Sequence, residues 1–184
     1  AENAFLVTQA LHTAIWGADW SNKPYWQGTG YRAQTLKRRD IGGKTGTTNS
    51  AKDAWFSGFS RRLVTTTWIG FDNPSKELGR TTKNKNLASK QTFGAEAGAK
   101  SAQPAWIDFM AQVLPYFAPE SFVQPDNIVS VRIDKSTGKL TEKTDKTTDF
   151  EFFMIGTTPT DYVQLDNSND IIDGGKDNDE HDIF

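Results

Sequence analysis

Residues 41–71 read IGGKTGTTNSAKDAWFSGFSRRLVTTTWIGF, and this run decides the fold. Three segments in it are rich in β-branched and aromatic residues, which favour strands; they lie at 41–48, 54–60 and 63–71. Apolar side chains alternate with polar ones in the second and third segments, and only Arg61 and Arg62 separate these two segments. This pattern predicts a β-hairpin inside a sheet of antiparallel strands.

Two segments that flank this run have the 3.6-residue periodicity of amphipathic helices. The first is 4–16, and its apolar stripe consists of Val7, Ala10, Leu11, Ala14 and Ile15. The second begins near Pro104 and ends at Pro115 and Pro119, with a stripe formed by Trp106, Phe109, Met110, Val113 and Leu114. Helices flanking an antiparallel sheet place the chain in the α+β class.

A small β appendage is expected after Pro125. Residues 127–141 alternate between apolar and polar side chains and contain turn residues at 134–138, which predicts a hairpin. Residues 150–155, FEFFMI, are a further candidate strand. We therefore expect three parts: residues 1–118 around the sheet, residues 119–160 as the appendage, and residues 161–184 as a tail.

Two long stretches lack periodicity. Residues 17–35 are dense in glycine and aromatic residues, which favours a shaped functional loop over a disordered one. Residues 72–100 are polar, and we expect them to run over the surface without regular structure. The tail holds one lysine and eight acidic residues at 161–184, a composition typical of disorder.

Composition disfavours several classes of partner. The net charge is −2, and Lys and Arg occur without the interleaved aromatic residues of a nucleic-acid surface, so no nucleic-acid partner is expected. No apolar run approaches the ~18 residues of a membrane span, so we expect no membrane contact by this segment.

Metal and cofactor chemistry are not expected either. The chain has no cysteine, and its two histidines, His12 and His181, lie near opposite ends. We expect His12 to lie on the flank of the first helix. The aspartates around Gly174 do not form a calcium loop, because Ile171 stands where an oxygen ligand is required. We therefore expect no metal and no cofactor.

The glycines around Lys44 need an explanation, because glycine weakens a strand unless a ligand or another backbone comes close. Gly43-Lys44-Thr45 matches the end of a phosphate-binding loop. However, Arg38 stands where the first glycine of that motif is required, and no helix is expected to follow. Nucleotide binding is therefore disfavoured.

A carboxylate-binding strand edge explains the pattern better. Lys44 supplies a cation with three donors, and the hydroxyls of Thr45 and Thr47 can point to one face of the strand. Gly46 leaves room for a peptide to pair with the edge, and the Thr47 N–H can face a carbonyl oxygen and stabilise an oxyanion. In the purely structural alternative, the glycines ease a twisted strand and Lys44 points to water.

Several separate motifs strengthen the functional interpretation, and they occur in a fixed order. They are KTGTTN at 44–49, KDAWFSGF at 52–59, TTTWIGFD at 65–72, LGRTT at 78–82, GAKSAQPAW at 98–106 and GTTPT at 156–160. From about residue 4 to about residue 160, the chain resembles the C-terminal part of the transpeptidase domain of a class A (bifunctional) penicillin-binding protein, of the type 1a of Gram-negative bacteria.

The resemblance implies a reaction and its site. In that family, a serine of an S-x-x-K motif attacks the D-Ala-D-Ala end of a peptidoglycan stem peptide, an S-x-N motif assists proton transfer, and K-T-G lines the opposite wall. An amine of a neighbouring stem peptide resolves the acyl-enzyme, and β-lactams trap the serine. The substrate-binding residues implied here are Lys44, Thr45, Gly46, Thr47 and Thr48, with Lys44 and the Thr47 N–H as catalytic groups.

The chain departs from the family pattern in one large respect. No serine begins an S-x-N, and the one literal S-x-x-K, Ser136 to Lys139, follows K-T-G and lies in a predicted turn. The nucleophilic serine is therefore expected to be absent from the chain, which we expect to be inactive alone. The resemblance places the parent protein at the periplasmic side of the inner membrane, with the anchor absent from this chain.

Two further expectations concern partners. A segment without its companions should expose apolar surface, so we expect the isolated chain to self-associate. The alternative to a transpeptidase is a non-catalytic binding or scaffolding module of a cell-wall synthesis complex, with candidate surfaces at 126–155 or at 16–31.

Overall fold

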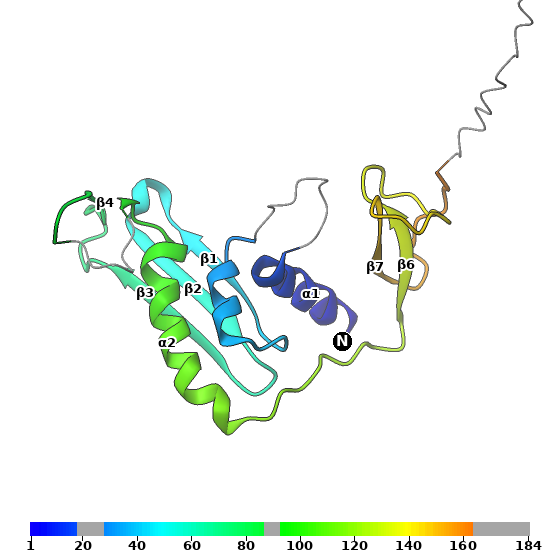
Figure 1. Cartoon of the computed structure of the whole chain (residues 1–184), viewed down its shortest axis with the longest axis horizontal. Coiled ribbons are helices and arrows are strands. Elements are labelled where there is room, and N and C mark those ends of the chain that lie inside the picture. The colour runs from blue at the N-terminus through cyan, green and yellow to red at the C-terminus, as the bar shows by residue number, and fades with distance from the viewer. Residues whose placement is uncertain (18–27, 87–92, 164–184) are drawn as a thin grey trace, which may run out of the picture.

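Three antiparallel strands form the main sheet in the order β1-β2-β3 (Figure 1). The computed structural model describes residues 1–17, 28–86 and 93–163. The strands are β1 (Gly42–Thr47), β2 (Asp53–Phe59) and β3 (Val64–Gly70). The register pairs Lys44 with Ser57 and Ser57 with Thr66. The predicted antiparallel strands and their hairpin are therefore confirmed.

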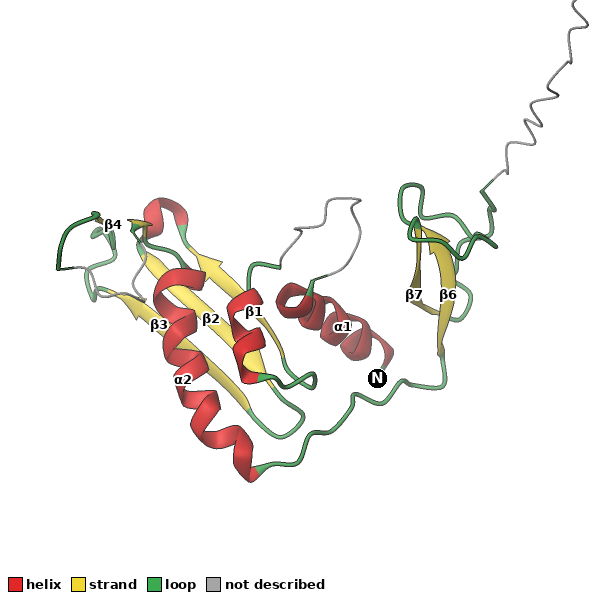
Figure 2. Ribbon diagram, viewed as in Figure 1, coloured by secondary structure: helices red, strands yellow, loops and turns green. Residues whose placement is uncertain are grey.

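Helices pack against this sheet, which confirms the α+β class (Figure 2). The two α-helices are α1 (Glu2–Trp16) and α2 (Gln103–Val113). The shorter helical turns are η1 (Tyr31–Leu36), η2 (Asn49–Ala51), η3 (Gly98–Ala102) and η4 (Leu114–Tyr116). In Figure 2, α2 crosses one face of the sheet, and α1 lies between the sheet and a separate pair of strands.

Trp106 of α2 lies at the centre of the core between that helix and the sheet. Its side chain is fully buried, and its ring centroid is 4.8 Å from that of Phe56 on β2. The indole N–H donates to the Thr65 carbonyl oxygen on β3 at 3.2 Å. A Cβ at Gly58 would lie 2.5 Å from the indole, so the helix can pack this closely only over a glycine.

The stripe predicted on α2 is right at Trp106, Met110 and Leu114, which are all buried. It is wrong at Phe109, whose side chain is 43% exposed. Ile107 packs partly buried against the core instead, because the sheet lies on that side of the helix.

The stripe predicted on α1 is wrong at two positions. Val7 is 58% exposed and Ala10 is also exposed, whereas the buried side chains are Phe5 and Ile15. Ile15 joins the core of the main sheet, and the Phe5 ring meets Phe152 edge-on at 5.2 Å. Different partners bury the two ends of the helix, so the buried positions do not share one face.

Segment 72–100 contains more regular structure than expected. The strands β4 (Arg80–Thr81) and β5 (Gly94–Ala95) form a short antiparallel pair. The segment then enters η3, a turn of π-helix that leads directly into α2. Hydrogen bonds between β4 and β5 satisfy backbone groups that the polar sequence does not mark as strands.

A second antiparallel sheet is formed by β6 (Ile128–Asp134) and β7 (Thr148–Met154). The predicted turn at 134–138 is present: Gly138 has φ +70°, and its N–H donates to the Asp134 carbonyl oxygen at 2.8 Å. The strand after this turn is not the main partner of β6, because only Leu140 forms a bridge with Ile133. The candidate strand at 150–155 takes that place as part of β7.

The linker from α2 to β6 is fastened beside β1. Arg38 donates through one nitrogen to the carbonyl oxygens of Leu114 and Phe117, at 2.9 and 3.0 Å, and forms a two-bonded ion pair with Asp40. Asp40 also accepts the Glu120 N–H at 3.2 Å. Burial alone would raise the pKa of Asp40, but the hydrogen bonds from Arg38 and Glu120 outweigh it and hold that pKa below its usual range.

The expected division at residues 118 and 119 stays a prediction. The second sheet contacts α1 through Phe5 and Phe152 and through a 3.1 Å hydrogen bond from Asn127 to Glu2. Most of the expected tail (164–184) and of the aromatic loop (18–27) lies outside the described residues. Among the helices in the described ranges, none has the length and apolar character needed to cross a membrane.

Trp106→Ala should lower the free energy of unfolding by about 3–5 kcal/mol, because it leaves a large cavity between α2 and the sheet. Tyr116→Ala is the matched control, since Tyr116 is an aromatic residue that is 84% exposed; it should cost less than about 0.5 kcal/mol. Urea denaturation followed by circular dichroism measures both. Equal losses in the two variants would contradict this description of the core.

Candidate functional site

The outer edge of β1, residues 44–47, is the candidate site. In the register with β2, the Thr48 N–H donates to the Asp53 carbonyl oxygen at 3.1 Å. Because hydrogen-bonded pairs alternate along an antiparallel ladder, Lys44 and Gly46 bond to β2, and the N–H groups of Thr45 and Thr47 point away from it. Among the described residues, no strand pairs with this edge.

The Lys44 side chain folds against the next residue of the strand, Thr45. Its ammonium donates to the Thr45 carbonyl oxygen at 2.9 Å and to the Thr45 hydroxyl at 3.2 Å. The Thr45 hydroxyl in turn donates to the hydroxyl of Thr29 at 3.0 Å. The structure thus brings an exposed cation and two hydroxyl groups together.

The Thr47 hydroxyl is held from another part of the chain. It accepts the N–H of Gly98, the first residue of η3, at 3.0 Å. A Cβ at Gly98 would lie 2.5 Å from the Gly46 carbonyl oxygen and would also collide with that of Trp55. Residue 98 must therefore be a glycine for η3 to pack on β1 and β2.

A carboxylate holds this turn in place. Glu96 accepts hydrogen bonds from the Lys100 ammonium and the Ser101 hydroxyl, both at 2.5 Å, and from the Thr81 hydroxyl at 2.6 Å. We call these four residues the Glu96 cluster. Burial alone would raise the pKa of Glu96, but the hydrogen bonds from Lys100, Ser101 and Thr81 lower it to about 2.

The other two predicted site residues have structural contacts. A Cβ at Gly46 would lie 3.2 Å from the Trp55 Cβ, so a side chain there would crowd the neighbouring strand. The Thr48 hydroxyl accepts the Asp53 N–H at 2.8 Å and closes the β1–β2 connection. Both residues are thus needed by the strand and its turn, whatever they contact outside the chain.

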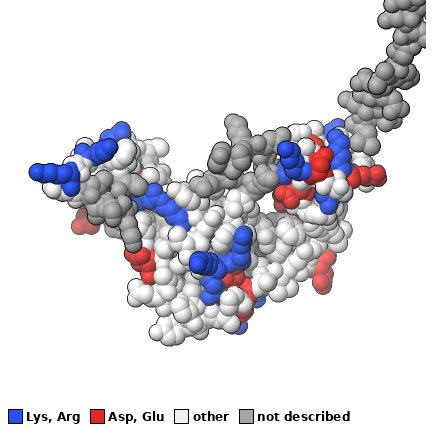
Figure 3. Space-filling model, viewed as in Figure 1, with Lys and Arg blue, Asp and Glu red and all other residues white. Residues whose placement is uncertain are grey.

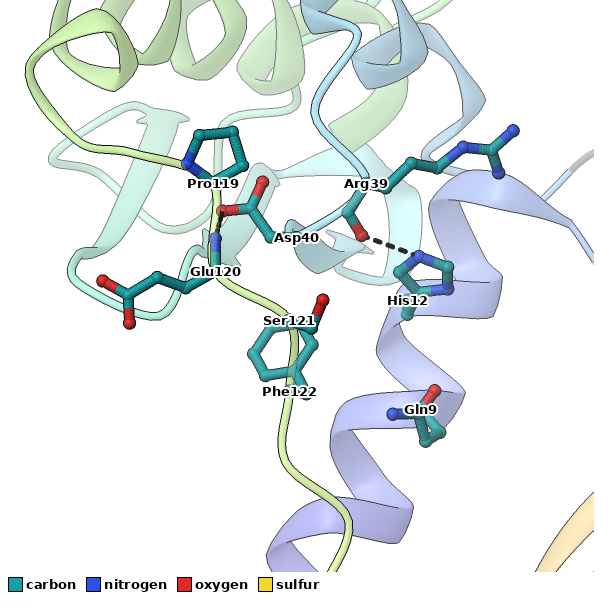
Figure 4. Close-up of a pocket in the computed structure, with 8 residues that line it drawn as sticks. All are labelled: Gln9, His12, Arg39, Asp40, Pro119, Glu120, Ser121 and Phe122. Atoms are coloured by element: carbon teal, nitrogen blue, oxygen red, sulfur yellow. Dashed lines mark hydrogen bonds between the residues drawn. The ribbon is translucent and has the colours of Figure 1, made fainter.

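A pocket of about 270 Å³ lies between α1, the start of β1 and the linker (Figure 4). Its lining residues are Gln9, His12, Arg39, Asp40, Pro119, Glu120, Ser121 and Phe122. Two of its polar groups already have partners: the His12 ring nitrogen Nε2 bonds to the Arg39 carbonyl oxygen at 3.0 Å, and Asp40 is paired with Arg38. Burial lowers the pKa of His12, so the ring is mostly neutral at pH 7. We assign no ligand to this pocket.

The literal S-x-x-K string lies far from β1 in the sequence and has partners of its own. The Ser136 hydroxyl donates to Asp134 at 2.6 Å, and the Lys139 ammonium lies 3.7 Å from the Asp161 carboxylate. The serine therefore faces Asp134 at the end of β6, whereas the lysine faces Asp161, which follows β7. On the face shown in Figure 3, basic side chains form separate small groups and no continuous stripe.

Comparison of the chain with known proteins identifies its family. Residues 124–167 match the family model "Penicillin-binding protein 1A, C-terminal domain". The chain is 50% identical to penicillin-binding protein 1A of Vibrio cholerae, over 88% of the chain and 20% of that protein, and 48% identical to that of Escherichia coli, over 94% and 20%. The chain belongs to the penicillin-binding protein 1A family.

A solved structure from this family has the same fold. The crystal structure of penicillin-binding protein 1A from Haemophilus influenzae superimposes with a TM-score of 0.73 at 42% identity, over 89% of this chain and 22% of that one. The chain thus spans about a fifth of the length of the curated relatives it matches. The family suggested by the order of motifs in the sequence is confirmed.

Sequence reasoning missed the residues that support β1 through hydrogen bonds to Thr45 and Thr47. Thr29 and Gly98 lie 16 and 51 residues from their partners Thr45 and Thr47, so no local pattern connects them. The spacing of Glu96 and Lys100, four residues apart, was an available signal for an ion pair on a helical turn.

The free energy of unfolding should depend on pH through Glu96. Its pKa rises from about 2 in the folded chain to about 4.5 in the unfolded one, so the stability it contributes is complete above about pH 4.5 and is lost as the pH falls toward 2. The wild type minus Glu96→Gln difference should shrink by about 2 kcal/mol between pH 6 and pH 3. A difference that does not change with pH, measured by urea denaturation, would refute this.

Proposed function

We propose that this chain forms the Lys44–Thr47 wall of a serine-type DD-transpeptidase site that cross-links peptidoglycan stem peptides. The observation that carries the proposal is the outer edge of β1, with which no strand of the described residues pairs. An ammonium, two hydroxyls and two outward N–H groups lie there within four residues. Membership of the penicillin-binding protein 1A family supports the same assignment.

Each group has a distinct task in this proposal. The Lys44 ammonium raises the positive potential where the substrate carboxylate and the reacting carbonyl lie. The hydroxyls of Thr45 and Thr47 contribute to carboxylate recognition, and Gly46 lets the peptide lie alongside the strand. The Thr47 N–H points away from β2 and donates to the oxygen that becomes negative when the carbonyl is attacked.

The nucleophile belongs to another part of the protein. A serine outside residues 1–184 attacks the penultimate D-Ala carbonyl, the bond to the terminal D-Ala breaks, and an amine from a neighbouring stem peptide then displaces the serine. β-Lactams carry a carboxylate beside a strained amide and react with the same serine. Such a reaction requires the periplasmic side of the inner membrane, where its substrate lies.

Lys44→Met in the full-length protein that contains this chain should lower the rate constant of acylation by a fluorescent penicillin about 100-fold, because it removes the cation from the site. Lys37→Met is the matched control: Lys37 is also exposed, and it precedes β1. Gel fluorescence against time measures both variants. Equal rates for wild type and Lys44→Met would overturn the proposal.

The chain of residues 1–184 alone should form no covalent adduct with the same penicillin, because it lacks the serine of the site. Intact-mass spectrometry after incubation is the measurement, and the full-length protein is the positive control. An adduct on this chain, at Ser136 or at any other residue, would show that the nucleophile lies within it.

A further inference from the structure

The two hydroxyls at the β1 edge differ in what their protons can do. A threonine hydroxyl has one proton to donate and two lone pairs to accept with. The Thr45 proton is already donated to Thr29, at 3.0 Å. The Thr47 oxygen accepts the Gly98 N–H, and within the described ranges its own proton has no acceptor. Thr47 is therefore the hydroxyl that can donate to an incoming anion without giving up a hydrogen bond within the described residues.

The direction of that proton depends on Gly98. An N–H donor occupies one lone-pair direction of the hydroxyl oxygen, and so restricts the positions left for its proton. Gly98 donates to Thr47 and lies over the Gly46–Trp55 pair, so close that a Cβ at residue 98 would collide with the carbonyl oxygens of both strands. A small shift of η3 would break its bond to Thr47.

Glu96 fixes η3 against such a shift. Its carboxylate ties together Lys100 and Ser101 within the turn and Thr81 on β4, and Lys100 also donates to the Gly94 carbonyl oxygen at 2.9 Å. The Glu96 and Lys100 side chains are 17% and 14% exposed, so water weakens this pair less than a surface pair. The cluster thus connects β4, β5 and η3 in one network.

We propose that Glu96 is a positioning residue: by holding Gly98 against β1, it aims the Thr47 hydroxyl at the terminal carboxylate of the stem peptide or of a β-lactam. This inference rests on the proposed function, in which Thr47 binds that carboxylate. Glu96, two residues before Gly98, thus takes part in substrate selection, although its carboxylate does not itself touch the substrate.

The test uses the full-length protein and two ligands, a fluorescent penicillin and its methyl ester, which lacks the anionic carboxylate. Glu96→Gln should lower the acylation rate constant for the penicillin about five- to tenfold, the order of one hydrogen bond to a charged group, and leave that for the ester within about twofold. Thr47→Val should do the same, and Thr47→Ser, which keeps the hydroxyl, should restore the rate.

A double variant separates positioning from a general loss of structure. In the Thr47→Val background, Glu96→Gln should cause no further loss, because the hydroxyl that it positions is absent. Ser101→Ala removes a single bond of the cluster and should show a smaller effect of the same kind, which covers the case that Glu96→Gln fails to fold.

The outcomes distinguish this inference from the proposed function. Equal losses for penicillin and ester in Glu96→Gln, or a further loss in the double variant, would overturn the positioning role while leaving the transpeptidase assignment in place. A full-length wild type that penicillin does not acylate would overturn the assignment itself, and the positioning role with it.

Discussion

The contact of Trp106 with Phe56 across Gly58 is the constraint on which the rest of the arrangement depends. It sets the distance between α2 and the sheet. Because η3 is continuous with the start of α2, the same contact determines where Gly98 meets Thr47. Close packing in the core therefore fixes the geometry at the strand edge, since a densely packed interior transmits displacements with little compliance.

Charge is used in two different ways around this sheet. Asp40 and Glu96 are largely buried, each is paired with a cation, and each has a lowered pKa. Lys44, by contrast, is exposed and bonds only to oxygens of Thr45 within the described residues. The buried pairs hold segments distant in sequence together, and the exposed cation keeps its charge available to an anion from outside.

Most of the sheet could be predicted from the sequence, because alternation in 54–71 and the short connection at Arg61 and Arg62 are local signals. The buried face of α1 could not, since Phe5 and Ile15 are buried by different partners. For the candidate site, the pattern around Lys44 identified the strand. The supports from Thr29 and Gly98 could not be predicted, because they are hydrogen bonds between segments 16 and 51 residues apart, and no local pattern connects such segments.

The attachment of the linker has a mechanical consequence. Arg38 and Asp40 lie only a few residues before Lys44. Arg38 donates hydrogen bonds to the backbone of Leu114 and Phe117, and Asp40 accepts one from the backbone of Glu120. Tension applied to the β6–β7 unit and carried along the linker would reach these hydrogen bonds of Arg38 and Asp40 before it reached α2. The residues just before β1 would therefore carry part of that tension, together with the contacts between the second sheet and α1.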